Sequence, residues 1–197
     1  DIEIRVMIRT RGGDCDYTER ELDVMGQDIR NLHGIGVTGV VFGILEHDGK
    51  VARSQVQRLV EEAGKDLTVC FHRAFDVCLD PVTALETLIE LGVDRVLTSG
   101  QAASVPEGTN ELKRLVEQSA GRIGILPGSG IFPENVAEVI AKTGVTEFHA
   151  TAFGTLTSQM KHQNPAVFMG IPGLPEYDRQ VTSEAEVRSF IKAARQA

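Results

Sequence analysis

Arginines, histidines and acidic residues of this sequence gather just after short apolar runs. Guanidinium groups and backbone N–H groups bind phosphates and carboxylates, while imidazole and carboxyl groups transfer protons. The candidate acid or base residues are His72, Asp76, Glu147 and His149, and the candidate anion-binding residues are Arg9, Arg11, Arg73, Gly128, Ser129 and Gly130. Together they predict a locally basic site for a small anionic ligand on an acidic protein.

Each of these candidates also has a purely structural interpretation. An arginine at a strand end can be an ion-pair partner, and Glu147 can simply neutralise Arg5 or Arg9. The turn from Gly128 to Gly130 can hold a phosphate through its N–H groups or can be only a tight turn before a helix. His72 by itself indicates a buried core histidine, but the arginine and aspartate that follow it favour a site.

Six apolar, β-branched runs predict the strands that must position these residues. They are Ile2 to Ile8, Val37 to Phe42, Leu67 to Phe71, Arg95 to Leu97, Ile123 to Leu126 and Thr146 to Phe148. Helical segments lie between them. Thr18 and Glu21 form a capping-box pattern, Asp80 before Pro81 marks a second helix start, and a proline precedes a helix over residues 134–142.

Strands that alternate with helices predict an α/β fold with a parallel sheet. An open doubly wound sheet and a TIM-type (β/α)8 barrel both have this order. Six units over 197 residues use about 33 residues each, so two more units would reach the ~250 residues of a full barrel. We therefore expect a single barrel domain over residues 1–197 that lacks its first two βα units, with a loop over 151–182 and a final helix over 183–196.

Such an incomplete barrel has two edge strands, one at Ile2 and one at Thr146. We expect that an upstream segment of the natural protein or a neighbouring chain covers them. Strand alternation places Arg5, Met7, Arg9, Thr68, Cys70, His72, Glu147 and His149 on inward faces. A further prediction places Arg9, Arg11, His72, Arg73, Asp76 and His149 in one cavity at the carboxyl ends of the strands.

Charge and composition limit the partners and the compartment. Lys and Arg number 20 against 28 Asp and Glu, and the net charge of −8 disfavours nucleic acid. No apolar run approaches the ~18 residues of a membrane span. Cys15, Cys70 and Cys78 cannot complete a disulfide framework and form no C-x-x-C pair, so we expect a reducing, cytoplasmic setting.

Motifs across nearly the whole chain resemble the CutC family of copper homeostasis proteins. They are M-I-R-T-R-G-G-D at Met7 to Asp14, V-F-G at Val41 to Gly43, F-H-R-A-F-D at Phe71 to Asp76, V-L-T-S-G at Val96 to Gly100, P-G-S-G-I at Pro127 to Ile131, E-F-H-A at Glu147 to Ala150, and Met160, Lys161 and Asn164. The resemblance implies a (β/α)8 barrel, copper binding through cysteine thiolates, a cytoplasmic location, and a homo-oligomer, either a dimer or a tetramer.

Three positions depart from the family pattern: Thr10 stands where proline is usual, Ser129 where glycine is usual and Gln163 where arginine is usual. The resemblance implies that the cysteines that the family links to copper lie in its first two strands, and we expect this chain to begin at the third. No metal ligand can therefore be assigned to a position here, and copper is implied by resemblance alone. We expect this chain by itself to bind Cu(I) weakly.

Three functional interpretations follow from the sequence. The first is a CutC-like protein of copper homeostasis. The second is a TIM-barrel enzyme that acts on a small phosphorylated or carboxylated substrate, with His72, Asp76, Glu147 or His149 as general acid or base. The third, a scaffold that works only through oligomer contacts, leaves the polar cluster unexplained. Whether the protein is an enzyme stays open at this point.

Overall fold

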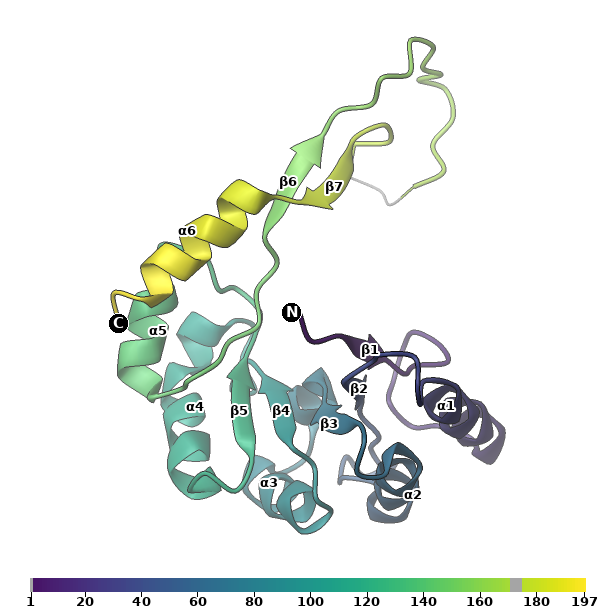
Figure 1. Cartoon of the computed structure of the whole chain (residues 1–197), viewed down its shortest axis with the longest axis vertical. Helices are drawn as coiled ribbons and strands as arrows, with labels where there is room; N and C mark the ends of the chain where they lie inside the picture. Colours follow the sequence, from purple (N-terminus) through teal and green to yellow (C-terminus); the bar gives the residue numbers. More distant parts are fainter. Residues whose placement is uncertain (1, 171–174) are drawn as a thin grey trace.

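A computed structural model describes residues 2–170 and 175–197, and its centre is a sheet of five parallel strands (Figure 1). The strands are β1 (Arg5–Met7), β2 (Gly39–Phe42), β3 (Thr68–Phe71), β4 (Arg95–Thr98) and β5 (Gly124–Pro127), which pair in chain order. The register aligns Met7 with Val41, Val41 with Cys70, and Cys70 with Arg95. Parallel strands paired in sequence order, with helices between them, form an open part of a (β/α)8 barrel.

Helices connect the strands and cover the outer face of the sheet (Figure 1). They are α1 (Glu19–Asn31), α2 (Arg53–Ala63), the 3-10 helix η1 (Arg73–Val77), α3 (Pro81–Glu90), α4 (Val105–Ser119), α5 (Val136–Thr143) and α6 (Glu184–Ala194). The predicted capping box of Thr18 and Glu21 is formed, and the Asp80 side chain accepts hydrogen bonds at the start of α3. None of the described helices is long and apolar enough to cross a membrane.

The hydrophobic core lies between the outer face of the sheet and these helices. Strand residues such as Val40, Phe42 and Phe71 are fully buried there. They pack against the apolar faces of the helices, which include Leu22, Met25, Ile29, Leu59, Leu85, Leu88 and Leu112. Burial of each large apolar side chain stabilises the fold by about 1.5–3 kcal/mol. Because the helices cover this apolar face, the other face of the sheet is directed toward the barrel interior.

The predicted sixth strand, Thr146 to Phe148, is not formed. A single parallel bridge joins His149 to Gly128, and the Phe148 ring packs against the Phe190 ring of α6 with centroids 6.0 Å apart. A segment with a sheet neighbour on one side only has few ladder bonds to hold it extended. Within the described ranges, β1 pairs with β2 alone, so β1 and the segment ending at His149 are the two open edges.

The loop predicted over residues 151–182 contains two strands. β6 (Phe153–Leu156) pairs with β7 (Arg179–Thr182) in antiparallel register, with Gly154 opposite Val181. Because the partners are far apart in sequence, no short hairpin signal marked them. The pair projects away from the sheet and carries a long connection at its end (Figure 1). Residues 171–174 of the predicted loop lie outside the described residues.

The helix predicted over 134–142 begins later, at Val136. The side chain of Asn135 accepts a hydrogen bond from the Phe132 N–H and donates one to the Gly130 carbonyl, and both bonds are 2.9 Å long. These bonds hold a turn ahead of the helix, so Pro133 is not its first residue. The predicted final helix is present as α6.

Candidate functional site

A cavity of 430 Å³ lies against the inward face of the sheet. Its lining residues are Glu3, Arg5, Met7, Val41, Cys70, Arg95, Leu97, Leu126, Glu147, Phe148 and His149. Five of these occupy positions that strand alternation placed on the inward face: Arg5, Met7, Cys70, Glu147 and His149. The interior of the barrel is thus the first candidate region for a ligand.

Glu147 is held in this cavity by Arg95. The Arg95 Nε donates to both carboxylate oxygens of Glu147 at 2.9 Å, and the hydrogen bond to Glu147 is the main reason why the pKa of Arg95 is raised. The sequence suggested an arginine of the first strand as the partner, but Arg5 pairs with Glu3 at 2.7 Å. Gly124 makes the contact possible, because a Cβ there would lie 2.7 Å from the Glu147 Oε1. Sequence reasoning missed Arg95, although its alternation with the buried Val96 was a usable signal.

Asp76 joins η1 to the loop after β4. Its side chain is 6% exposed, and it accepts hydrogen bonds from the Arg73 Nε at 2.5 Å, the Ser99 N–H at 2.9 Å and the Ser99 hydroxyl at 3.0 Å. The Thr98 hydroxyl and the Gln101 N–H also donate to it. A carboxylate with this many internal donors is well placed to fix the loop. Its role as an acid or base stays a prediction.

Arg11 ties the loop after β1 to the start of α1. Its Nε donates to Glu21 at 2.6 Å, its Nη1 donates to Asp14 at 2.9 Å, and its guanidinium lies 5.0 Å from the centre of the Tyr17 ring. Because Arg11 and Arg73 both have internal carboxylate partners, an anion would have to compete with these ion pairs. Tyr17 was not among the residues singled out in the sequence, since nothing local marks it.

His72 is buried, at 6% exposure, directly after β3. Its Nδ1 accepts a hydrogen bond from the Ala74 N–H at 3.0 Å, so the ring proton resides on Nε2. Burial, with a smaller contribution from the charge of Arg9, lowers the pKa of His72 to about 4. At neutral pH this imidazole is therefore uncharged, and its Nε2 can donate a hydrogen bond.

The turn from Gly128 to Gly130 is shaped by close packing. The Gly128 N–H donates to the Thr98 carbonyl at 3.0 Å, and a Cβ at Gly128 would lie 2.6 Å from a methyl group of Leu97. Ser129 and Gly130 have φ angles of 94° and 72°, the left-handed region. Since α5 begins only at Val136, no helix N-terminus follows the turn directly. Phosphate binding by this turn stays a prediction.

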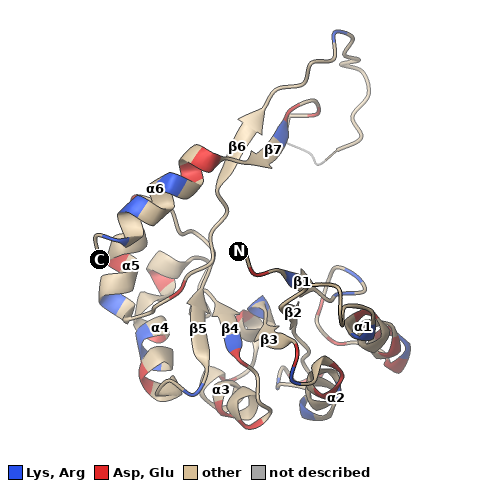
Figure 2. Cartoon of the chain, in the orientation of Figure 1, with Lys and Arg blue, Asp and Glu red and all other residues tan. Residues whose placement is uncertain are grey.

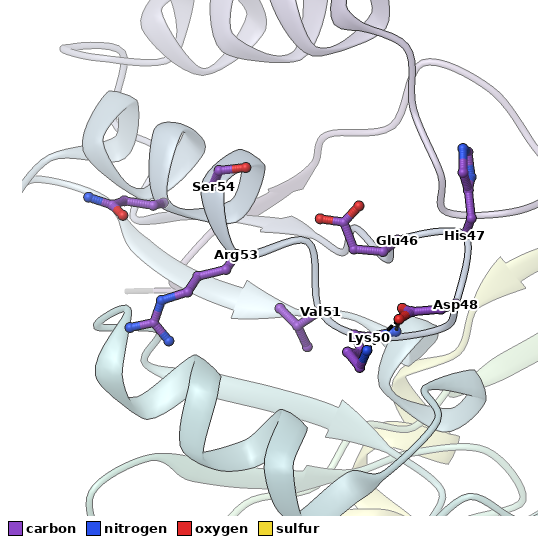
Figure 3. Close-up of a pocket in the computed structure, with 8 residues that line it drawn as sticks. Glu46, His47, Asp48, Lys50, Val51, Arg53 and Ser54 are labelled. Atoms are coloured by element: carbon purple, nitrogen blue, oxygen red, sulfur yellow. Dashed lines mark hydrogen bonds and ion pairs between the residues drawn. The ribbon is translucent and has the colours of Figure 1, made fainter.

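A wider hollow of 670 Å³ lies at the loop between β2 and α2 (Figure 3). Both of its lysine and arginine side chains have partners close by: Lys50 pairs with Asp48, and Arg53 pairs with Glu90 at 2.8 Å. Figure 3 shows Glu46, His47 and Arg53 extending in different directions. Such an arrangement does not direct several groups onto one ligand atom.

The three cysteines are free thiols that belong to different parts of the fold. Burial raises the pKa of Cys70 and of Cys78 to about 11, so both are protonated at neutral pH. Across residues 2–170 and 175–197, no three His, Cys, Asp or Glu side chains converge as metal ligands would. Cys70 does share the inward cavity with Met7 and His149. The cavity thus holds sulfur donors of the kind that Cu(I) prefers, but these side chains do not form a preformed copper site.

The six residues predicted to share one cavity lie in several places. His149 lines the inward cavity, whereas the other five are not among its lining residues. Arg73 and Asp76 pair beside β4, and Arg11 is bound to the α1 start. Arg9 and His72 both follow strands at the carboxyl edge of the sheet, two residues after Met7 and Cys70. That all six residues share one cavity at the carboxyl ends of the strands stays a prediction.

Comparison with known proteins identifies the family. The model of the CutC family matches residues 1–154. The chain is 44% identical over 192 residues to a CutC family protein of Chromobacterium violaceum, covering 98% of this chain and 77% of the relative. It is 45% identical over 190 residues to a human copper homeostasis protein cutC homolog, covering 96% of this chain and 69% of that protein. The chain belongs to the CutC family.

The solved structure of a CutC copper homeostasis protein from Streptococcus agalactiae matches this CutC-family chain with a TM-score of 0.72 and 32% identity. The match covers 75% of this chain and 72% of the other. An N-acetylneuraminate lyase from Proteus mirabilis, at 11% identity and a TM-score of 0.52, shares the fold alone. The family resemblance and the partial TIM-type barrel predicted from the sequence are thereby confirmed.

Proposed function

We propose that this protein acts in copper homeostasis. The observation that carries the proposal is 45% identity over 96% of the chain to the human protein named for that role. A mouse protein of the same name is 44% identical over the same share of the chain. Similarity of this extent includes the strands and loops that line the barrel interior, where a ligand of this fold would bind.

In this proposal copper is a cargo that binds weakly as Cu(I) in the inward cavity. The thiol of Cys70, the thioether of Met7 and the imidazole of His149 line that cavity, and Cu(I) prefers such donors. Binding to the thiolate must displace a proton from a group whose pKa is about 11. At pH 7 this proton competition lowers the affinity by about 10⁴-fold relative to a free thiolate.

A competition titration against a chromogenic Cu(I) chelator tests this site. We expect weak binding that strengthens as the pH rises from 7 to 9, and that decreases in Cys70→Ser but not in the matched control Cys15→Ser. Tight one-to-one Cu(I) binding that is lost in Cys70→Ser would contradict the predicted weak affinity. Equal binding by Cys70→Ser and the unmodified chain would overturn the assignment of the cavity.

Deletion of the gene in its host tests the cellular role. We expect a changed cellular copper content, measured by mass spectrometry, and a changed growth limit in added copper, both restored by the intact gene. An unchanged copper content and an unchanged growth limit at every copper level would refute a role in copper homeostasis.

The proposal also includes a cytoplasmic location and a homo-oligomer, dimer or tetramer. Free thiols support a reducing compartment. Exposed apolar side chains on β6 and the connection beyond it, such as Leu156, Phe168 and Met169, support contacts with a second copy. Few charged residues interrupt this region (Figure 2). Light scattering should give the mass of a dimer or tetramer, and Phe168→Ser should lower it; a monomer at all concentrations would exclude this assembly.

A further inference from the structure

We propose that Arg9, Tyr17 and His72 form a binding site for a small oxyanion, the phosphate or carboxylate group of a metabolite, at the carboxyl ends of β1 to β3. The site is separate from the inward cavity to which copper is assigned above, since none of these residues lines that cavity. Its ligand would meet hydrogen-bond donors from three different parts of the fold.

The sheet register brings Arg9 and His72 into one row. Met7, Val41 and Cys70 are aligned on adjacent strands, and two residues further along each strand stand Arg9, Gly43 and His72. The ladder continues past the strand ends, because the His72 N–H donates to the Phe42 carbonyl at 2.8 Å. Adjacent strands are about 4.8 Å apart, so Arg9 and His72 start about 10 Å apart, within reach of an arginine side chain.

Gly43, on the strand between them, makes room for the His72 ring. A Cβ at this position would lie 2.5 Å from the His72 Nδ1 and 2.6 Å from its Cε1. The imidazole therefore occupies the place that a side chain on β2 would take. Its Nδ1 is bound to the backbone of η1, which leaves Nε2, on the opposite side of the ring, as the free donor.

Two buried polar side chains have unused donors at this place. The His72 Nε2 and the Tyr17 hydroxyl find no hydrogen-bond partner among the described residues, although the two residues are only 6% and 4% exposed. The hydroxyl of Thr10, next to Arg9 in the chain, is also buried without a hydrogen-bond partner among the described residues. Unpaired buried polar groups are costly, and a cluster of them is explained well by a ligand.

Arg9 lies near both buried groups and supplies positive charge. Its charge adds to the effect of burial in lowering the pKa of His72, and its hydrogen bonding and charge partly offset the rise that burial causes in the pKa of Tyr17. One of its N–H groups donates to the Gly13 carbonyl at 2.7 Å, and a guanidinium has five N–H donors in all. Burial raises the pKa of Tyr17, so its hydroxyl stays protonated and can donate. The nearby carboxylate of Asp14 is paired with Arg11 at 2.9 Å.

The set therefore consists of one cation and two neutral donors, with no free carboxylate among them. The positive charge of Arg9 disfavours a cation at this place, and the donors match an anion with several acceptor oxygens. Phosphate and carboxylate share this chemistry. The three donors come from the end of β1, the loop after it and the end of β3, all at the carboxyl edge of the sheet.

Calorimetric titration of the full chain with inorganic phosphate and with acetate, at constant ionic strength in chloride, tests the site. We expect saturable binding of at least one of the two. Tyr17→Phe removes only the unpaired hydroxyl and should weaken binding about three- to tenfold, and Arg9→Gln should weaken it more than about tenfold. Tyr177→Phe is the matched control, because the Tyr177 hydroxyl bonds the Asn164 N–H far from this site and should not affect binding.

Stability measurements separate ligand binding from a structural role. Without ligand, Tyr17→Phe should keep or raise the melting temperature, since it removes an unpaired buried hydroxyl, whereas a hydroxyl needed for the fold would lower it. Phosphate and acetate that bind the unmodified chain, Tyr17→Phe and Arg9→Gln equally would overturn the proposal. Heat changes no larger than those of added chloride would overturn it as well.

Discussion

The replacement Asp76→Asn tests whether the buried carboxylate fixes the loops at the carboxyl ends of β3 and β4. Its side chain is 6% exposed and accepts from two donors of Ser99, from Thr98, from Gln101 and from Arg73. An amide keeps one acceptor oxygen, but its NH₂ group faces donors where the second oxygen was. Two charge-assisted bonds lost at about 1.5 kcal/mol each predict a loss of about 3 kcal/mol in the free energy of unfolding.

Guanidinium denaturation followed by circular dichroism measures this loss. We expect a lower midpoint with an unchanged slope, since the mutation alters stability and not the surface exposed on unfolding. Asp48→Asn is the control, because that aspartate is on the surface beside Lys50 and should leave the midpoint unchanged. Arg73→Gln should shift the midpoint less than Asp76→Asn, since the Arg73 side chain is 44% exposed and can return to water.

A loss below about 1 kcal/mol for Asp76→Asn would refute this reasoning. It would mean that water or a rotated side chain satisfies the loop donors at little cost. A loss equal to that of Arg73→Gln would also count against it, because the ion pair and not the buried loop donors would then carry the stability.

Three further outcomes are expected. Gly43→Ala should lower the free energy of unfolding by about 1–3 kcal/mol, since its Cβ would meet the His72 ring. The control Gly12→Ala should not lower it, because a Cβ there has nothing within 4 Å. Equal denaturation midpoints for the two variants would contradict the close packing of Gly43 against His72. The pKa of His72 is 6.5 in the unfolded state and about 4 in the folded state, so only the unfolded state binds the proton between these pH values. The free energy of unfolding should therefore fall by about 3 kcal/mol as the pH drops from 6.5 to 4. Denaturation curves of His72→Gln should lack this dependence of the free energy on pH. Cys70 and Cys78, with pKa values of about 11, should react with a disulfide reagent at pH 7.5 only after unfolding, and rapid native reaction of all thiols would disprove their burial.

Local signals were enough to predict most of the elements. The capping box of Thr18 and Glu21, and Asp80 ahead of Pro81, act through bonds within one helical turn, so their neighbours in sequence determine them. Strand alternation likewise predicted that Cys70 and Glu147 face the barrel interior. The family was also readable, since its motifs run along most of the chain.

Contacts between distant segments were decided by the tertiary structure. Glu147 pairs with Arg95 because Gly124 leaves room between them, and β6 finds β7 more than 20 residues away; neither partner can be read from neighbouring residues. Spacing likewise could not show that Arg11 and Arg73 already have carboxylate partners.

The sequence by itself determined most of the helices and the five strands of the main sheet, the family, and which side chains follow the carboxyl ends of those strands. It could not determine which of those side chains are still free to bind a ligand. That depends on burial and on partners brought from elsewhere in the chain: Asp76 is saturated with donors, while the His72 Nε2 and the Tyr17 hydroxyl have no partner within the described residues. Hydrogen bonding and desolvation act over a few ångströms in space, and only the folded chain sets those distances.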